Sequence, residues 1–125
     1  MGINRAQPLN ILVIDDEEEI CEVFSKFLSY EGYRVQTVTT GRKALNLAVK
    51  EFFNIVFLDL VMPGTSFFKV FENIKKISPK TKVFLMTGKL MNKDSLNELR
   101  EKNVAGILQK PFRLDEIMEF VEGNV

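Results

Sequence analysis

Residues 11–18 read ILVIDDEE, four apolar residues followed directly by a run of carboxylates. Four consecutive apolar side chains predict a strand that is buried on both faces, as in a parallel sheet covered by helices. The same design recurs as IVFLD at 55–59 and as VFLMT at 83–87. A polar residue therefore stands at the end of each apolar run: Asp15, Asp59 and Thr87. These three residues are expected together at the carboxyl end of a parallel sheet.

Less apolar strands and amphipathic helices fill the rest of the chain. Residues 33–38 and 105–109 are short and only partly apolar, so they are expected at the two edges of the sheet. Apolar residues spaced by three and four predict five helices. The stripe of the first is Ile20, Val23, Phe24, Phe27 and Leu28, and that of the third is Phe67, Val70, Phe71, Ile74 and Ile77.

The ends of the helices are also marked. Thr39 or Thr40 is expected to cap the second helix, and Asn92 the fourth. The third helix is expected to end before Pro79, and the fifth carries its apolar residues between 114 and 121. Five strand–helix units in succession predict an α/β fold, with a doubly wound parallel sheet and helices on both faces.

The length and composition fit one domain. The chain has 125 residues, of which 46% are hydrophobic, enough for a buried core. Residues 1–8 are polar and lack the apolar segment of a secretory signal, so they are expected to form a flexible lead-in to a domain at 9–125. No stretch approaches the roughly 20 apolar residues that a membrane span requires.

Charge and composition exclude several kinds of site. Lys plus Arg equals Asp plus Glu, at 17 each, so no basic surplus predicts nucleic-acid binding by this domain. The absence of histidine excludes Ser-His and Cys-His nucleophiles and zinc sites with histidine ligands. Cys21 is the one cysteine, which excludes an internal disulfide and fits the reducing cytoplasm.

The polar residues at the predicted strand ends form the candidate site: Asp15, Asp16, Asp59, Thr87 and Lys110. In doubly wound sheets, ligands bind outside the carboxyl ends of the strands. Neighbouring carboxylates repel one another, and Mg²⁺ relieves the repulsion with oxygen ligands. A lysine and a hydroxyl beside them suit phosphoryl transfer, in which a carboxylate can itself be the nucleophile.

Each of these residues also has an alternative interpretation in which its role is purely structural. Asp16 with Glu19 could cap a helix, and Asp59 could be a turn residue before the Met-Pro-Gly sequence at 62–64. Thr87 could belong to a turn, and Lys110 could simply leave a strand before Pro111. The occurrence of all of them at successive strand ends favours a shared site instead.

Four motifs then resemble one family, the receiver domains of two-component response regulators. They are ILVIDDE at 11–17, FLDLVMPG at 57–64, MTG at 86–88 and KPF at 110–112. The resemblance covers residues 9–121 and implies the flavodoxin-like strand order 2-1-3-4-5. It also implies a phosphoacceptor that is not an enzyme, with a sensor histidine kinase or a histidine phosphotransfer protein as its partner.

The resemblance assigns a role to each matching position. Asp59 would accept the phosphoryl group, and Mg²⁺ would be held by Asp15, Asp16, Asp59 and the backbone carbonyl of Val61. Lys110 and Thr87 would contact the phosphoryl oxygens, and the Lys110–Pro111 bond would be cis. Output to an unknown downstream protein would use the fourth helix, the fifth strand and the fifth helix. We expect the loop around Leu90 and Met91 to move most, and Ile20 with Val23 to offer the kinase an apolar contact.

Three positions depart from the family pattern. Phe67 stands where a glycine is usual, Ile107 stands where an aromatic residue is usual, and Arg113 replaces an acidic helix cap. The first two favour an alternative function, a receiver-like interaction domain that acts without phosphorylation, whereas the complete acidic pocket weighs against it. A haloacid-dehalogenase-type phosphatase would need Asp-x-Asp-x-Thr after the first strand, and a dinucleotide-binding domain would need Gly-x-Gly-x-x-Gly. The sequence supplies neither motif.

Overall fold

Strands and helices alternate along the chain in the computed structural model, which describes residues 8–62, 64, 66–88 and 92–124. None of the helices in those residues is long and apolar enough to cross a membrane. In chain order the elements are β1 Asn10–Ile14, α1 Glu18–Tyr30, β2 Arg34–Val38, α2 Gly41–Ala48, β3 Ile55–Asp59, α3 Phe67–Ile77, β4 Lys82–Thr87, α4 Lys93–Glu101, β5 Gly106–Gln109 and α5 Leu114–Glu122.

The strands form one parallel sheet in the order β2-β1-β3-β4-β5. The two least apolar strands, β2 and β5, lie at its edges, as their sequences predict. Ile14 of β1 stands beside Leu58 of β3, and Asp59 of β3 stands beside Met86 of β4. The predicted fold class and strand order are confirmed. This register brings Asp15, which follows β1, to the carboxyl end of the sheet together with Asp59 and Thr87, which end β3 and β4.

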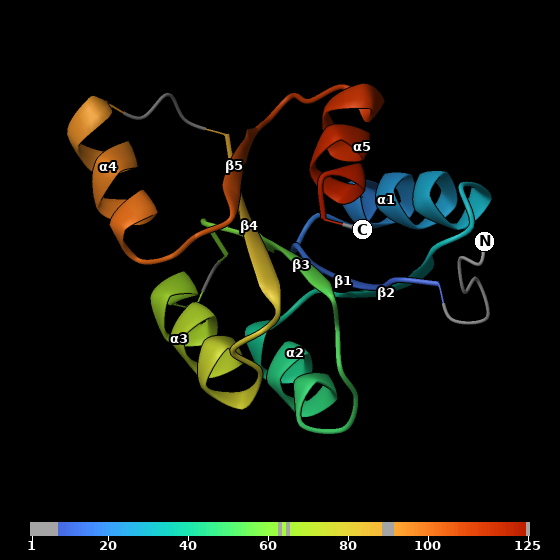
Figure 1. Cartoon of the computed structure of the whole chain (residues 1–125), viewed down its shortest axis with the longest axis horizontal. Coiled ribbons are helices and arrows are strands. Elements are labelled where there is room, and N and C mark those ends of the chain that lie inside the picture. Colours follow the sequence, from blue (N-terminus) through green and yellow to red (C-terminus); the bar gives the residue numbers. More distant parts are fainter. Residues whose placement is uncertain (1–7, 63, 65, 89–91, 125) are drawn as a thin grey trace.

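Helices cover both faces of the sheet (Figure 1). Because side chains alternate along a strand, Ile11 and Val13 point into the core beneath α1 and α5, whereas Leu12 and Ile14 point into the core beneath α2, α3 and α4. β3 and β4 alternate in the same way. Double-sided burial explains why these three strands are apolar without interruption.

The helix caps agree with the sequence and include one that the sequence analysis missed. Thr40 Oγ accepts a hydrogen bond from Lys43 N at 3.2 Å, and Asn92 Oδ1 accepts one from Ser95 N at 2.8 Å. Ser66 Oγ accepts from Lys69 N at 3.4 Å and so caps α3. Phe67 thus begins a helix, and Asn103 is the one non-glycine residue with positive φ among the described residues. The missing family glycine therefore imposes no strained backbone at position 67.

Three residues of the predicted apolar stripes are exposed: Val23, Ile77 and Leu114. Leu114 is 44% exposed and is the first residue of α5, ahead of the buried Ile117 and Val121. Val23 is 41% exposed, because the buried stripe of α1 runs through Cys21, Phe24 and Leu28 and leaves Val23 to one side. Ile77 is 40% exposed, because it is the last residue of α3, where the helix ends. Cys21 is buried and packs as a small core residue.

Candidate functional site

Three carboxylates converge at the carboxyl ends of β1 and β3. One oxygen each of Asp15, Asp16 and Asp59 lies within 4.8 Å of the other two. Asp15 follows the last residue of β1 and is fully buried, Asp59 ends β3 and is 4% exposed, and Asp16 is exposed. The cluster is therefore buried on its protein side and open to solvent at Asp16.

Backbone hydrogen bonds hold the two buried carboxylates in place. Asp15 N donates to Val38 O at 3.1 Å, and Asp15 Oδ1 accepts from Glu17 N at 2.9 Å. Asp59 Oδ1 accepts from Val61 N at 3.3 Å. Each of the two carboxylates accepts a backbone hydrogen bond at Oδ1, so its Oδ2 is available to other partners.

The alternative interpretation of Asp16, as a cap of the first helix, is wrong. Glu17 is the N-cap of α1 and makes no side-chain capping bond, so Asp16 does not cap this helix. Cys21 Sγ, one turn into α1, donates to the Asp15 carbonyl at 3.3 Å, which fixes the helix against the loop. Burial first, and then the nearby charge of Asp15, raise the pKa of the Cys21 thiol, so this cysteine is an inert packing residue.

Lys110 supplies the positive charge of the site. Its Nζ lies 2.8 Å from Asp15 Oδ2, 3.6 Å from Asp59 Oδ2 and 3.7 Å from Glu17 Oε1. The peptide bond to Pro111 is cis, as the family resemblance implies. Sequence reasoning gave Glu17 no role, although its place two residues after Asp15 in the same loop was the available signal.

Thr87 occupies the adjoining strand end. It is the last residue of β4 and is 4% exposed. Its carbonyl accepts a hydrogen bond from Lys110 N at 2.7 Å, so the backbone ties the ends of β4 and β5 together. The structure thus brings Asp15, Asp16, Asp59 and Lys110 into one cluster and places Thr87 next to it.

The cluster shifts the titration of its members. Burial raises the pKa of Asp59 to about 6, and the negative charges of Asp15 and Asp16 also raise it. The hydrogen bond from the Val61 N–H and the positive charge of Lys110 lower this pKa, but by less. Burial alone would lower the pKa of Lys110, but the short contact with Asp15 and the charges of Asp59 and Glu17 raise it overall. The site therefore carries more negative charge than its one ammonium balances.

This donor set fits a divalent cation. Asp15 is fully buried, and its Oδ2 is balanced by the Lys110 ammonium at 2.8 Å, which is shared with Asp59 and Glu17. Carboxylate oxygens alone, with no nitrogen or sulfur donor in the cluster, suit a hard cation such as Mg²⁺. The acidic triad could therefore bind a metal at the solvent-facing side, beside Asp16.

The raised pKa of Asp59 predicts a pH-dependent stability in metal-free buffer. A carboxyl group whose folded-state pKa is raised stabilises the fold fully below the unfolded value of 3.8, and this contribution is lost as the pH rises to about 6. The difference in unfolding free energy between wild type and Asp59→Asn should change by about 3 kcal/mol at most over this range. Urea unfolding at a series of pH values, with chelator present, measures it; a difference independent of pH would contradict the prediction.

Comparisons with known proteins agree with this geometry. The sequence model of the family described as "Response regulator receiver domain" matches residues 11–122. Sporulation initiation phosphotransferase F of Bacillus subtilis is 31% identical over 114 residues, which cover 90% of each chain. The uncharacterized transcriptional regulatory protein YkoG of the same organism is 31% identical over 109 residues, 87% of this chain but 47% of the relative. The chain thus spans about half the length of several curated relatives.

A solved structure shows the same arrangement of the backbone. The response regulator protein TrrA of Thermotoga maritima, crystallised in complex with Mg(2+)-BeF, superposes with a TM-score of 0.80. It is 31% identical, and the superposition covers 94% of this chain and 99% of TrrA.

Proposed function

Because the chain belongs to the response regulator receiver domain family, whose members are phosphoacceptors rather than catalytic enzymes, we propose that Asp59 accepts a phosphoryl group in the presence of Mg²⁺ and thereby switches a partner protein. One observation carries the proposal: Lys110 Nζ, from the residue after β5, lies 2.8 Å from the buried carboxylate of Asp15 and 3.6 Å from that of Asp59. The Mg(2+)-BeF complex of TrrA supports the involvement of a metal.

The chemistry is a transfer between two nucleophiles. A carboxylate oxygen of Asp59 attacks the phosphorus of a phosphohistidine on the partner, the new O–P bond forms as the P–N bond breaks, and the electron pair returns to the imidazole nitrogen. Lys110 pairs with the phosphoryl oxygens, and the Thr87 hydroxyl donates to one of them. Asp15, Asp16, Asp59 and the Val61 carbonyl would hold Mg²⁺, which would neutralise charge on the phosphoryl group.

The measurement that tests this function is the mass of the intact protein after incubation with a small acyl phosphate and Mg²⁺. We expect a gain of one phosphoryl group, and none once the metal is chelated. A protein that gains nothing with Mg²⁺ present would instead act as a receiver-like interaction domain. The independent domain is proposed to be 9–125, and a cytoplasmic location fits its single buried thiol.

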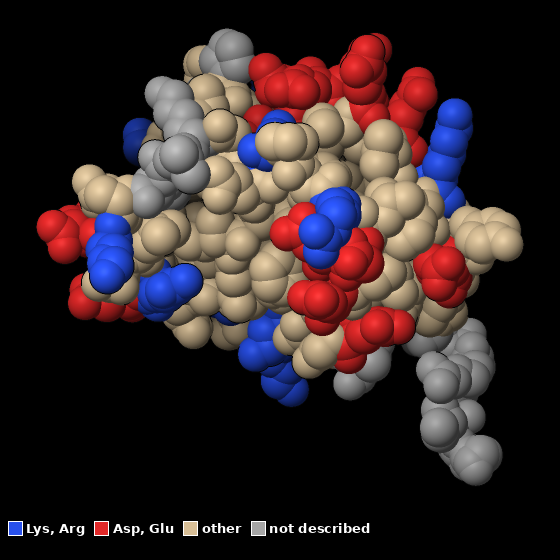
Figure 2. Space-filling model, turned by 90° about the horizontal axis from the view of Figure 1, so that it is seen from above, with Lys and Arg blue, Asp and Glu red and all other residues tan. Residues whose placement is uncertain are grey.

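We propose that the phosphodonor, a sensor histidine kinase or a histidine phosphotransfer protein, docks on α1 beside the acidic pocket. Ile20 is half-buried and Val23 is exposed, so an apolar contact is available one to two turns after Asp16. The helices beside the pocket are rich in acidic residues: α1 carries Glu18, Glu19 and Glu22, and α5 carries Asp115, Glu116, Glu119 and Glu122. Figure 2 shows groups of Asp and Glu side chains on the face seen from above.

Val23→Glu should slow phosphotransfer from the cognate kinase by about tenfold, because it places a charge in the apolar contact. Labelling by a small acyl phosphate should be unchanged, because the pocket itself is intact. Val49→Glu is the matched control, since Val49 is 66% exposed and follows α2, away from the pocket. Rates of phosphoryl gain are compared by intact mass; equal losses from both donors would assign Val23 to folding rather than docking.

Output is proposed to use α4, β5 and α5. Pulling the Thr87 hydroxyl toward a phosphoryl group would shift the following loop, but Leu90 and Met91, the segment expected to move most, lie outside the described residues. Ile107 of β5 is half-buried and packs against the core beneath α3 and α4. A β-branched side chain is stiff at its first torsion, so its swing would be smaller than that of the usual aromatic residue.

A further inference from the structure

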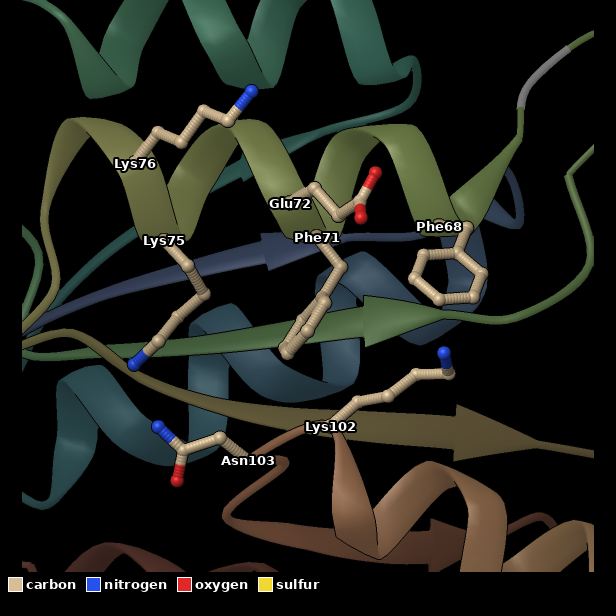
Figure 3. A pocket seen from close by; sticks show the side chains of 7 residues that line it. All are labelled: Phe68, Phe71, Glu72, Lys75, Lys76, Lys102 and Asn103. Carbon is tan, nitrogen blue, oxygen red and sulfur yellow. The ribbon is translucent and has the colours of Figure 1, made fainter.

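A hollow of about 450 Å³ separates α3 from the end of α4 (Figure 3). Leu99 is the one buried side chain among the described residues of α4, so the helix is anchored to the core mainly there and stands away from α3 elsewhere. The lining residues are Phe68, Phe71, Glu72, Lys75, Lys76, Lys102 and Asn103. None of them belongs to the acidic pocket.

The floor of this groove is aromatic. Phe68, Phe71 and Lys75 follow one another at spacings of three and four, so they share one face of α3 and point toward α4 in Figure 3. Phe71 is 5% exposed and belongs to the core, whereas Phe68 is half-buried and stacks on Phe67 with ring centroids 5.7 Å apart. The floor is therefore rigid and apolar, and its volume suits one or two large side chains.

The lining of the groove is basic. It includes three lysines and one glutamate, a balance of two positive charges, although the Lys76 side chain extends away from the aromatic floor in Figure 3. The carboxyl ends of α3 and α4 offset about half a charge each, so roughly one net positive charge is left over. This contrasts with the acidic face formed by α1 and α5.

Two of the lysines, Lys102 and Lys75, make contacts of different strength. Lys102 Nζ lies 4.1 Å from the centroid of the Phe68 ring, a weak contact at an exposed position that a carboxylate can replace. Lys75 Nζ donates to Pro79 O at 3.0 Å and to Thr81 O at 2.8 Å, which fixes its ammonium at the base of the groove. The groove thus offers a movable cation at one end and a fixed one at the other.

We propose that the α3–α4 groove binds an acidic linear segment of a partner protein. An aromatic or aliphatic side chain of the segment rests on Phe68 and Phe71, and its flanking carboxylates pair with Lys102 at one end and Lys75 at the other. Charge and shape both favour this occupant: Phe68 and Phe71 offer an aromatic floor, and the lysines of the lining outnumber its one acid. Nucleic acid is disfavoured, since Glu72 stands on the rim and the whole chain carries no net charge.

The probe is a short labelled peptide with one phenylalanine between two runs of glutamate. NMR shifts of the ¹⁵N-labelled protein should change at residues 67–77 and 99–104 and not around Asp59. Lys102→Glu should weaken binding at least about tenfold, because the substitution reverses the charge beside Phe68. Lys43→Glu is the matched control, with the same change in net charge at an exposed position outside the groove, and should bind like wild type.

Further variants test the floor and the independence from phosphorylation. Phe68→Ala should also weaken binding at least about tenfold, with an unchanged spectrum away from the groove as the check on folding. Asp59→Asn should bind the peptide like wild type, which separates this proposal from the phosphoacceptor function. Equal weakening by the Lys43→Glu control, equal binding of a peptide with serine in place of glutamate, or tighter binding of a single-stranded oligonucleotide at these residues would overturn the proposal.

Discussion

Asp59→Asn should abolish the gain of a phosphoryl group from a small acyl phosphate in the presence of Mg²⁺. A neutral amide oxygen is a poor nucleophile, and the substitution removes one of the three carboxylates that approach within 4.8 Å. The loss should be complete rather than partial, because a missing nucleophile cannot be replaced by better positioning. The mass of the intact protein shows the presence or absence of the added group directly.

Asp94→Asn is the matched control for this variant. Asp94 is exposed in the first turn of α4, so the same chemical change there should leave labelling at the wild-type level. Unfolding curves would show that Asp59→Asn is folded, and in metal-free buffer near pH 7 it should be more stable than wild type, because a carboxylate with a raised pKa no longer has to be charged in a buried site. Undiminished labelling of Asp59→Asn would move the acceptor to another residue.

The sheet could be predicted from the sequence because its central strands are buried on both faces. Uninterrupted apolar runs such as 11–14 and 55–58 are too short for buried helices and too apolar for strands with one solvated face, so they fit the interior of a covered sheet. The strand order did not come from these runs; it came from the family resemblance, since all the central strands look alike in composition. The exposure of Val23 was missed because residues at the border of an apolar stripe can fall on either side of it.

The site was predictable to the extent that it depends on strand ends. Asp15, Asp59 and Thr87 each follow or end an apolar run, so topology alone places them at one edge. Contacts between loops were not predictable in this way. The approach of Glu17 to Lys110 depends on side-chain reach, and the groove beside Phe68 depends on how far α4 stands from α3. Neither distance can be read from a single sequence, although the place of Glu17 in the loop after Asp15 marks it as a neighbour of the site.

Lys110→Met should destabilise the metal-free protein by about 3 kcal/mol, because removing one partner of a buried ion pair leaves the other charge uncompensated. The fully buried Asp15 loses its ion-pair partner at 2.8 Å, and Asp59 loses the cation at 3.6 Å. Methionine keeps much of the length and the apolar stem of lysine, so the change isolates the ammonium. Urea unfolding at pH 7, with chelator and then with excess Mg²⁺, measures the effect.

The two conditions separate the two roles of this ammonium. Mg²⁺ binds to carboxylates, so it should return much of the lost stability to Lys110→Met. Phosphoryl labelling by a small acyl phosphate should stay at least about 100-fold slower even with Mg²⁺, because no other group in the pocket supplies the fixed positive charge beside Asp59. Lys43→Met, at an exposed position on α2, should change neither quantity. If Lys110→Met were as stable as wild type without metal, the ammonium would not be the counter-charge of the carboxylates, and its place between Asp15 and Asp59 would have to serve the phosphoryl group alone.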